Sequence, residues 1–591
     1  MGVEEGFQPI PYLEGNPYTT DPALPGLLKR LLPPSVAAEV EPDLVRFGDE
    51  VITSIRAISE RVAPPRLTQY NHWGQRVDVL ETSEGWRDLK AVCFKEGMPG
   101  IFYERKYNEY SRLYGFAKIH LMAGDSHVIH CPMSMTDGCA RVLELIGTPE
   151  MKRELLPRLI SRDPSTAFTS GQWMTERPGG SDVSLTETTA TPTEHAKGTM
   201  WPEFQLNGFK WFSSATDSNI SVALARTGDT KDGSRSLSLF LVPLRLPLIR
   251  DISSPEPSPI SNGIYVHRLK NKIGTHIVPT AELSLQSTKA YLLGELNQGV
   301  KNIIPVLNIT RIYSGMSGIG GIRKCLAIAT TYSQVRAIRS GTQVLKDNAL
   351  HVAQLASISL TYRALTHLTY GTILMMGKVE TGVASVEEQH LLRILTAVVK
   401  AFTAEKAAAA MEEAMTTLGG MGYMEEVGIG RSIRDALVEK IWEGTTAVLA
   451  MEIVRSAKNP TTFAAFGSWS LRVIDSVPDS LKVRLQHSLS ILQAGIQQTL
   501  AVYKASTDMS PLVPRPALLL VGHTASSVFL LEHAVWSWNT KDTECETDVE
   551  VFRRWVVEGG LSGVMEEVRI AQEAVKSRIA TNRSITYGSK L

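Results

Sequence analysis

Residues 204–214 read Phe204-Gln205-Leu206-Asn207-Gly208-Phe209-Lys210-Trp211-Phe212-Ser213-Ser214, which predicts a hairpin with a tight Asn-Gly turn. Apolar residues alternate again downstream, at Leu237/Leu239/Leu241 and at Ala281/Leu283/Leu285, and residues 220–225 predict a further strand. Loops rich in Gly, Ser, Pro and Asp separate these strands, at residues 228–234 and 253–263. We therefore expect a small β-domain over residues 166–293.

Helical periodicity flanks this β-domain on both sides. Before it, a Pro-rich lead is followed by apolar spacing through Leu113, Phe116, Ile119, His120 and Met122. After it, Ser385 and Glu388 form a candidate capping box, followed by an apolar stripe that continues through residues 407–410 and stops at Gly419-Gly420.

These patterns predict an α+β multidomain chain. We expect an N-terminal helical domain (1–165), a middle β-barrel-like domain (166–293), a C-terminal four-helix bundle (294–460) and an additional helical domain (461–591). A β-domain inserted between two helical ones creates a cleft where they meet.

Charge and cysteine content exclude several classes of protein. Lys+Arg and Asp+Glu both number 61, and residues 461–591 hold 13 of each sign, so no bulk positive field favours nucleic acid. The five cysteines form no CxxC pair and no zinc-ligand spacing, so we expect no metal site. The N-terminus lacks a secretory signal, and no apolar run approaches the roughly 20 residues that span a bilayer, which predicts a soluble protein.

The last three residues form a targeting signal. Ser589-Lys590-Leu591 is the C-terminal signal that the peroxisomal import receptor reads, so we expect the protein in the peroxisomal matrix. Residues 581–588 are polar, and we expect them to be extended.

Three segments have residues suited to chemistry. The loop 174–182 offers hydroxyls at Thr175 and Ser181 and backbone N–H groups beside Gly179-Gly180, which can bind a flavin edge and a phosphate, although an ordinary turn has the same composition. Trp211 and Phe212 are adjacent on a strand and should point to opposite faces, so that one can cover a flat ring while the other packs in the core; core packing of both rings is the alternative.

The third segment, Ile441-Trp442-Glu443-Gly444-Thr445, places a carboxylate between Trp and Gly after a helix. Burial there would raise the pKa of the carboxyl and suit it to removing a weakly acidic proton; a solvated glutamate at a helix start is the alternative.

In order and context, these segments resemble the acyl-CoA dehydrogenases, over nearly the whole chain. The family pattern T-E-x-x-x-G-S-D corresponds to Thr175-Glu176…Gly180-Ser181-Asp182, N-G-x-K-x-W-I-T/S to residues 207–214, a Gly-Gly loop to residues 418–423, and (Y/W)-E-G-T to residues 442–445. Tyr70-Asn71-His72 with Arg76-Val77-Asp78, Cys131-Pro132 with Met135-Thr136, and the additional C-terminal region most resemble the AidB-like branch.

The resemblance implies FAD bound between the β-domain and the bundle, in a homodimer or homotetramer. Glu443 corresponds to the catalytic base, which takes the α-proton of an acyl-CoA thioester while flavin N5 accepts the β-hydride. Arg336 and the Leu418-Gly419-Gly420 loop correspond to residues that reach a neighbouring subunit's FAD. The remaining residues expected to bind FAD are Gln172, Trp173, Met174, Thr175, Gly180, Ser181, Trp211, Phe212, Ser213, Ser214, Trp442, Gly444 and Thr445.

The chain departs from the family pattern at several positions. Residues 337–341 replace the usual x-Q-F-G after Arg336, Thr446-Ala447 replace S-Q, and Phe212 stands where most members have Trp. These departures leave open the details of dinucleotide binding and of the oligomer contacts.

Other functions remain open beside acyl-CoA dehydrogenation. Reoxidation by O₂ would make the protein an acyl-CoA oxidase, and the substrate can belong to fatty-acid metabolism or to the acyl chain of a secondary metabolite. A different class is a flavin-containing, DNA-associated AidB-like protein with little dehydrogenase activity, which the balanced charge disfavours.

Overall fold

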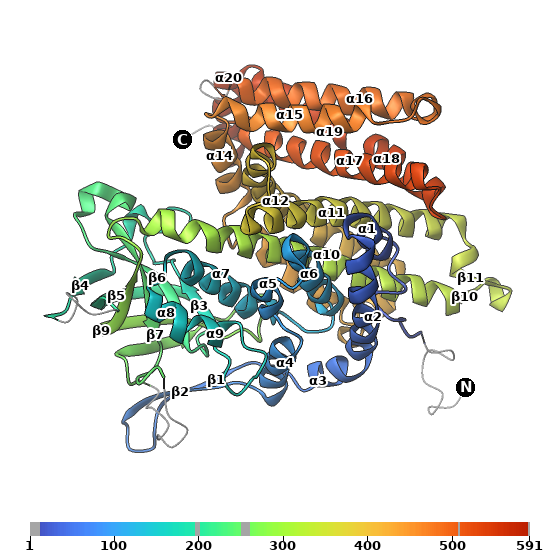
Figure 1. Cartoon of the computed structure of the whole chain (residues 1–591). Coiled ribbons are helices and arrows are strands. Elements are labelled where there is room, and N and C mark those ends of the chain that lie inside the picture. Colours follow the sequence, from blue (N-terminus) through green and yellow to red (C-terminus); the bar gives the residue numbers. More distant parts are fainter. Residues whose placement is uncertain (1–11, 195–200, 250–259, 506–508, 589–591) are drawn as a thin grey trace. The chain divides into compact units, whose positions relative to one another are not determined.

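The computed structural model describes residues 12–194, 201–249, 260–505 and 509–588 (Figure 1). The chain forms two compact units. Unit 1 comprises Met1–Val45, Tyr107–Leu113 and Ser314–Leu591, and unit 2 comprises Arg46–Lys106 and Tyr114–Tyr313. Helix α2 (Pro34–Glu50), helix α6 (Ser111–Met122) and helix α10 (Gly299–Val335) each run from one unit into the other. The two units are described separately below.

A closed β-barrel forms the centre of unit 2. Its strands are β3 (Ser170–Trp173), β4 (Thr189–Pro192), β5 (Glu203–Ser214), β6 (Ile220–Arg226), β7 (Leu237–Pro243), β8 (Ile264–Leu269) and β9 (Thr280–Leu293). Their order is β3-β6-β4-β5-β9-β7, with β8 paired to β9, and an additional β6–β7 pairing closes the sheet. The predicted strands at 220–225, 237–241 and 281–285 are confirmed within β6, β7 and β9.

The predicted hairpin at Asn207-Gly208 is wrong, because β5 runs unbroken through these residues. The partner of β5 is β9, paired antiparallel from Glu203↔Tyr291 to Ser214↔Thr280, with a register shift between Leu206 and Gly208. Asn207 Oδ1 accepts a hydrogen bond from the Ser287 N–H at this bulge. Long-range pairing with β9 thus outweighs the local turn preference of Asn-Gly.

Helices of unit 2 cover one face of the barrel. Ile220, Val222 and Leu224 of β6 pack in a core with α7 (His130–Ile146), α8 (Pro149–Glu154) and α9 (Leu156–Leu159), whereas Ala223 and Ala225 face the barrel interior. This period-two alternation buries both faces of the strand. Unit 2 also contains the pair β1 (Arg66–Tyr70) and β2 (Arg76–Glu81), the π-helix Val51–Ile55, the 3-10 helices Val183–Leu185 and Thr230–Ser236, and helices α3 (Arg56–Ser59), α4 (Glu84–Lys95) and α5 (Gly100–Glu104).

Long helices make up unit 1. Helix α12 (Val386–Thr417) packs against α11 (Ala349–Thr381) and against α14 (Thr446–Ser456). The predicted capping box is confirmed: Ser385 Oγ accepts from the Glu388 N–H, and the Glu388 carboxylate accepts from the Ser385 N–H. A small hairpin of β10 (Ala337–Ile338) and β11 (Gln343–Val344) joins α10 to α11, and α13 (Ile429–Ala436) precedes the segment that carries Glu443.

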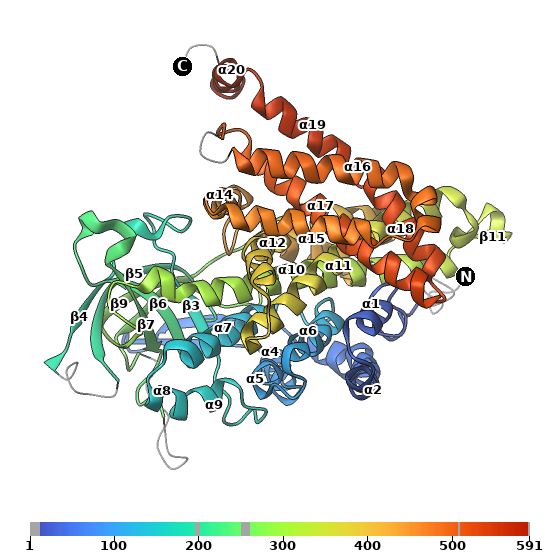
Figure 2. The ribbon, with the colours of Figure 1, turned by 45° about the horizontal axis from the view of Figure 1, so that its top comes forward.

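The C-terminal third of unit 1 is helical, with α15, α16 and α17 side by side in both views (Figures 1 and 2). Its helices are α15 (Pro460–Asp475), α16 (Asp479–Lys504), α17 (Pro514–Thr540), α18 (Cys545–Glu558), α19 (Leu561–Gln572) and α20 (Val575–Tyr587), and α1 (Leu24–Leu31) packs on α17. Contrary to the sequence expectation, α17 has the length and composition of a membrane span. Its apolar stretch is 89% buried inside the fold, as in a core helix.

The expectation of an extended tail at residues 581–588 is also wrong, because α20 extends to Tyr587. None of the residues of α20 is buried. The address Ser589-Lys590-Leu591 lies outside the described residues.

Candidate active site

In unit 2, a buried ion pair anchors the loop that follows β3. Glu176 is 3% exposed and accepts hydrogen bonds from Lys210 Nζ (2.6 Å) and from the backbone N–H groups of Glu187 (2.6 Å) and Thr188 (3.2 Å). Lys210, on β5, is fully buried and also donates to the Leu224 carbonyl (2.8 Å). Burial alone would raise the pKa of Glu176, but the Lys210 charge and these hydrogen bonds hold that pKa below its usual value.

This ion pair fixes the position of the predicted flavin-binding residues on the loop. The Trp211 N–H donates to the Thr175 carbonyl (3.0 Å), which ties the loop to β5 a second time. A Cβ at Gly179 would lie 2.1 Å from the Asp182 carbonyl oxygen, and one at Gly180 would lie 3.0 Å from the Thr175 side chain. The turn therefore leaves no room for a side chain at position 179 and little at position 180.

The aromatic pair on β5 differs from the sequence expectation. Trp211 is half-buried and Phe212 is 49% exposed, so neither ring packs in the barrel core. The pairing of β5 with β9 shifts register between Lys210 and Ser213, and this irregularity breaks the strict alternation of faces. Lys270 Nζ lies 3.1 Å from the centroid of the Trp211 ring and 4.5 Å from that of Phe212.

Two residues predicted to bind FAD each have a buried polar atom without a hydrogen-bond partner among the described residues. Gln172 Oε1 and Ser213 Oγ are buried and make no hydrogen bond among the described residues. Buried polar atoms are rarely left unpaired, so these two fit a ligand that brings donors and acceptors of its own. The residues of this part of unit 2 therefore fit the flavin that the resemblance implies. Trp173 differs from them, because its ring is fully buried in the core and donates to the Ser214 carbonyl (3.3 Å).

In unit 1, Glu443 lies on a short, unusual turn. Its backbone is left-handed, with a φ of 55°, and Gly444 follows with a φ of 99°. Thr445 then caps α14, accepting from the Val448 N–H. A left-handed glutamate costs on the order of 1–3 kcal/mol and is found mainly where surrounding contacts enforce it, often at functional sites.

Buried charged groups hold both neighbours of Glu443. The Trp442 indole N–H donates to Glu439 Oε2 (2.6 Å), which also accepts from the Ser314 hydroxyl. Lys400, fully buried on α12, donates to the Gly444 carbonyl (2.6 Å). Burial raises the pKa of Glu439 to about 7; its hydrogen bonds and the Lys400 charge oppose this rise, and the Glu443 charge adds to it.

The other predicted residues of unit 1 lie at helix ends. Leu418 is buried at the end of α12, whereas Gly419, with a φ of 61°, and Gly420 are exposed on the loop that follows. Arg336 is exposed directly after α10. The predicted residues thus fall into one group in each unit.

Sequence reasoning missed Glu439, Lys400 and Lys270. A signal for the first was present, because Glu439 precedes Glu443 by four residues, the spacing of neighbours on a helix face. Lys400 interrupts the apolar run Val398-Val399-Lys400-Ala401-Phe402, and a charge inside a buried stripe indicates a buried partner.

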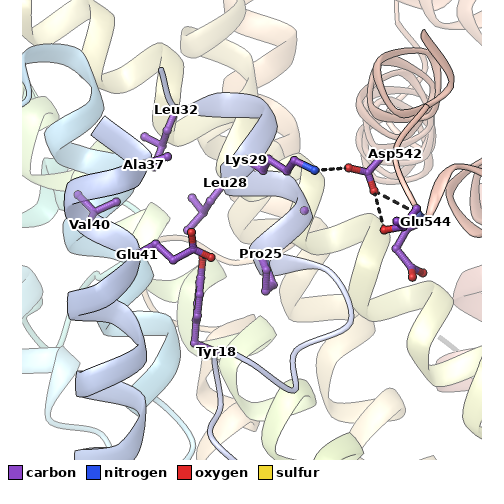
Figure 3. A pocket seen from close by; sticks show the side chains of 12 residues that line it. Tyr18, Pro25, Leu28, Lys29, Leu32, Ala37, Val40, Glu41, Asp542 and Glu544 are labelled. Carbon is purple, nitrogen blue, oxygen red and sulfur yellow. Dashed lines mark hydrogen bonds and ion pairs between the residues drawn. The ribbon is translucent and has the colours of Figure 1, made fainter. Parts of the chain in front are cut away.

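A separate cavity in unit 1 has a volume of about 270 Å³ (Figure 3). It lies among α1, α2 and the turn between α17 and α18, where Lys29 pairs with Asp542 at 2.6 Å. No residue predicted to bind FAD or to act as the base lines it, so we do not assign it to the reaction.

Comparison with known proteins identifies three domains along the chain. Residues 8–164 match the adaptive response protein AidB N-terminal domain, residues 171–288 the acyl-CoA dehydrogenase middle domain, and residues 297–458 the acyl-CoA dehydrogenase C-terminal domain. "Acyl-CoA dehydrogenase family member 11" of Caenorhabditis elegans is 34% identical over 582 residues, covering 95% of this chain and 90% of that protein.

Two further relatives extend this comparison. "Putative acyl-CoA dehydrogenase AidB" of Escherichia coli (strain K12) is 25% identical over 460 residues, covering 76% of this chain and 79% of that protein. The crystal structure of Caenorhabditis elegans ACDH-11 in complex with C11-CoA superposes with a TM-score of 0.88 at 32% identity, covering 99% of this chain and 97% of that one. The chain therefore belongs to the acyl-CoA dehydrogenase family of FAD-dependent enzymes, and has the AidB-type N-terminal domain.

Proposed function

We propose that the protein dehydrogenates an acyl-CoA thioester between its α- and β-carbons, with Glu443 as the base. The observation that carries this proposal is the Glu443 turn, whose two flanking residues are fixed by the buried side chains of Glu439 and Lys400. A base on a fixed turn keeps its carboxylate oxygen in one place, which is what proton removal requires.

The chemistry divides between the chain and the cofactor. Glu443 takes the α-proton onto a carboxylate oxygen, and the α-carbon keeps the electron pair of that bond to form the new double bond. When bound, FAD supplies the acceptor for the hydride that leaves the β-carbon, so the flavin gains two electrons and the thioester loses two hydrogens. Thr175, Ser181, Ser213 and Ser214, with Gln172, would hold the flavin.

The range of acyl-chain lengths that the protein accepts can be determined by experiment, beginning with the length that a relative binds. The Caenorhabditis elegans structure has C11-CoA bound, so thioesters around that length are the first to test. We expect anaerobic mixing of the purified protein with a panel of straight and branched acyl-CoAs to bleach the flavin absorbance, fastest with one length class. If the flavin is bound but no thioester bleaches it, the proposed reaction is wrong.

The electron acceptor follows from a second arm of the same experiment. After reduction, air is admitted with and without an electron-transferring flavoprotein. Stoichiometric H₂O₂ at a rate matching turnover would identify an oxidase, and reoxidation only in the presence of the flavoprotein would identify a dehydrogenase.

We also propose that Ser589-Lys590-Leu591 directs the protein to peroxisomes. With a fluorescent protein fused to the N-terminus, we expect the full chain to co-localise with a peroxisomal marker and a chain lacking these three residues to stay in the cytosol. Because the receptor reads a free terminus, two residues added after Leu591 should have the same effect as the deletion. Import that survives both changes would refute this address.

A further inference from the structure

A second carboxyl lies behind the Glu443 turn. Glu439 belongs to the 3-10 helix Leu437–Lys440 and is 2% exposed. Its Oε2 accepts two hydrogen bonds, one from the Ser314 hydroxyl on α10 and one from the Trp442 indole N–H. The hydrogen bond from Ser314 links Glu439 to α10. The hydrogen bond from Trp442 links Glu439 to the residue directly before Glu443.

A buried cation holds the other side of the turn. Lys400 Nζ donates to the Gly444 carbonyl at 2.6 Å, and its charge acts favourably on ionised Glu439. Glu443 is thus flanked by one residue bonded to Glu439 and one bonded to Lys400. Charge-assisted hydrogen bonds of this kind are short and strong, and here they hold a left-handed turn that has no preference for glutamate.

Glu439 and Glu443 repel each other when both are ionised. Burial raises the pKa of Glu439 to about 7, and the Glu443 charge adds to this rise. Two nearby cations have other partners: Arg434 on α13 bonds Glu425 at 2.8 Å, and Lys440 lies 3.8 Å from Glu405. The ionisation of either carboxyl therefore disfavours the ionisation of the other.

We propose that Glu439 is a positioning residue for Glu443: it fixes the Trp442 side of the turn, and its ionisation controls the pH range over which Glu443 acts as the base. This inference rests on the proposed role of Glu443. Below neutral pH, Glu439 is protonated and has no negative charge to act on Glu443. Above neutral pH, Glu439 is ionised as well, and its repulsion makes Glu443 the stronger base.

Glu439→Gln tests this inference, because Gln keeps the size and an acceptor for the Trp442 N–H but removes the charge. We measure the anaerobic rate of flavin reduction from pH 5 to pH 9 with the best thioester of the panel. The wild type should show two ionisations and the variant one: the acidic limb of kcat/KM, set by Glu443, stays in place, and the upper ionisation, set by Glu439, is missing. At pH 8, kcat should fall roughly three- to tenfold with KM nearly unchanged, because a weaker base remains.

Glu405→Gln is the matched control. Glu405 lies on α12 and accepts from the Thr446 hydroxyl at 2.8 Å, so it contacts the same segment but neither Trp442 nor Glu443 in any bond described above. We expect the wild-type pH profile from this variant. Flavin absorbance and thermal melting of each variant establish that it folds and binds its cofactor.

A wild-type pH profile in Glu439→Gln would overturn the inference, and so would a loss of stability or a raised KM with both ionisations in place. If Glu439→Gln does not fold, Ser314→Ala decides instead. This variant removes one hydrogen-bond donor from the Glu439 carboxylate, so the pKa of the upper ionisation should rise. An upper pKa equal to that of the wild type would overturn the inference. Failure of the proposed function is distinct, because either no thioester would then reduce the flavin of the wild type, or Glu443→Gln would reduce its flavin as fast as the wild type.

Discussion

Replacement of Glu443 by Gln is expected to slow flavin reduction by acyl-CoA thioesters by roughly 10²- to 10⁴-fold, the range over which a positioned general base contributes. Gln is nearly isosteric with Glu, so the left-handed turn and its contacts through Trp442 and Gly444 should remain. Stopped-flow absorbance under anaerobic conditions measures the rate, and the spectral shift of the flavin on adding thioester measures binding. We expect the dissociation constant to change by less than about threefold.

Glu425→Gln is a suitable control for this result. Glu425 is also a glutamate of unit 1, but it pairs with Arg434 on an exposed segment, and we expect wild-type rates from its variant. If Glu443→Gln reduced its flavin as fast as the wild type, Glu443 would not be the base. If it lost flavin instead, the residue would have a structural role in holding the cofactor.

Replacement of Lys210 by Met is expected to destabilise unit 2 by about 3–5 kcal/mol and to release FAD, because it leaves Glu176 buried without its cation. The side chains of the pair are 0% and 2% exposed, and Glu176 anchors the predicted flavin-binding loop on β5. Chemical denaturation followed by intrinsic fluorescence measures the stability, and the ratio of flavin to protein absorbance measures cofactor content.

A surface ion pair that also involves β5 gives the control. Lys289 on β9 bonds Glu203 on β5 at 3.0 Å with 38% of the Lys289 side chain exposed, so Lys289→Met should cost less than about 1 kcal/mol. The double variant Lys210→Met with Glu176→Gln should recover part of the loss, since no uncompensated buried charge remains. Equal effects of Lys210→Met and Lys289→Met would contradict the anchoring role.

Local sequence patterns correctly predicted the strands and the helix start that depend mainly on neighbouring residues. The strands at 220–225 and 237–241 follow from alternation, and the start of α12 follows from the Ser385–Glu388 capping box. The predicted turn at Asn207-Gly208 is wrong because β5 pairs with β9, some 80 residues away, and this pairing makes the two residues part of a bulge. No local signal contains that pairing, so the error was not avoidable from the sequence.

In the candidate site, too, some residues could be identified from local sequence and others only from the folded chain. Motif order identified residues of both groups, and their roles stay predictions until tested. What the motifs did not contain is the support behind them: Lys400 bonded to Gly444, Glu439 bonded to Trp442, and Lys270 over the Trp211 ring. These contacts join residues from different elements, and only the folded chain brings them together.

The measurement that tests the central claim most directly uses the best acyl-CoA thioester with deuterium at its α- and β-carbons, mixed anaerobically with a known amount of oxidised enzyme. We predict one 2-enoyl-CoA per flavin reduced, with one deuterium lost from each of the two carbons, and slowed formation of both product and reduced flavin relative to the unlabelled thioester. A recovered thioester that keeps all its deuterium while the flavin remains oxidised would contradict the assignment of this reaction to the protein.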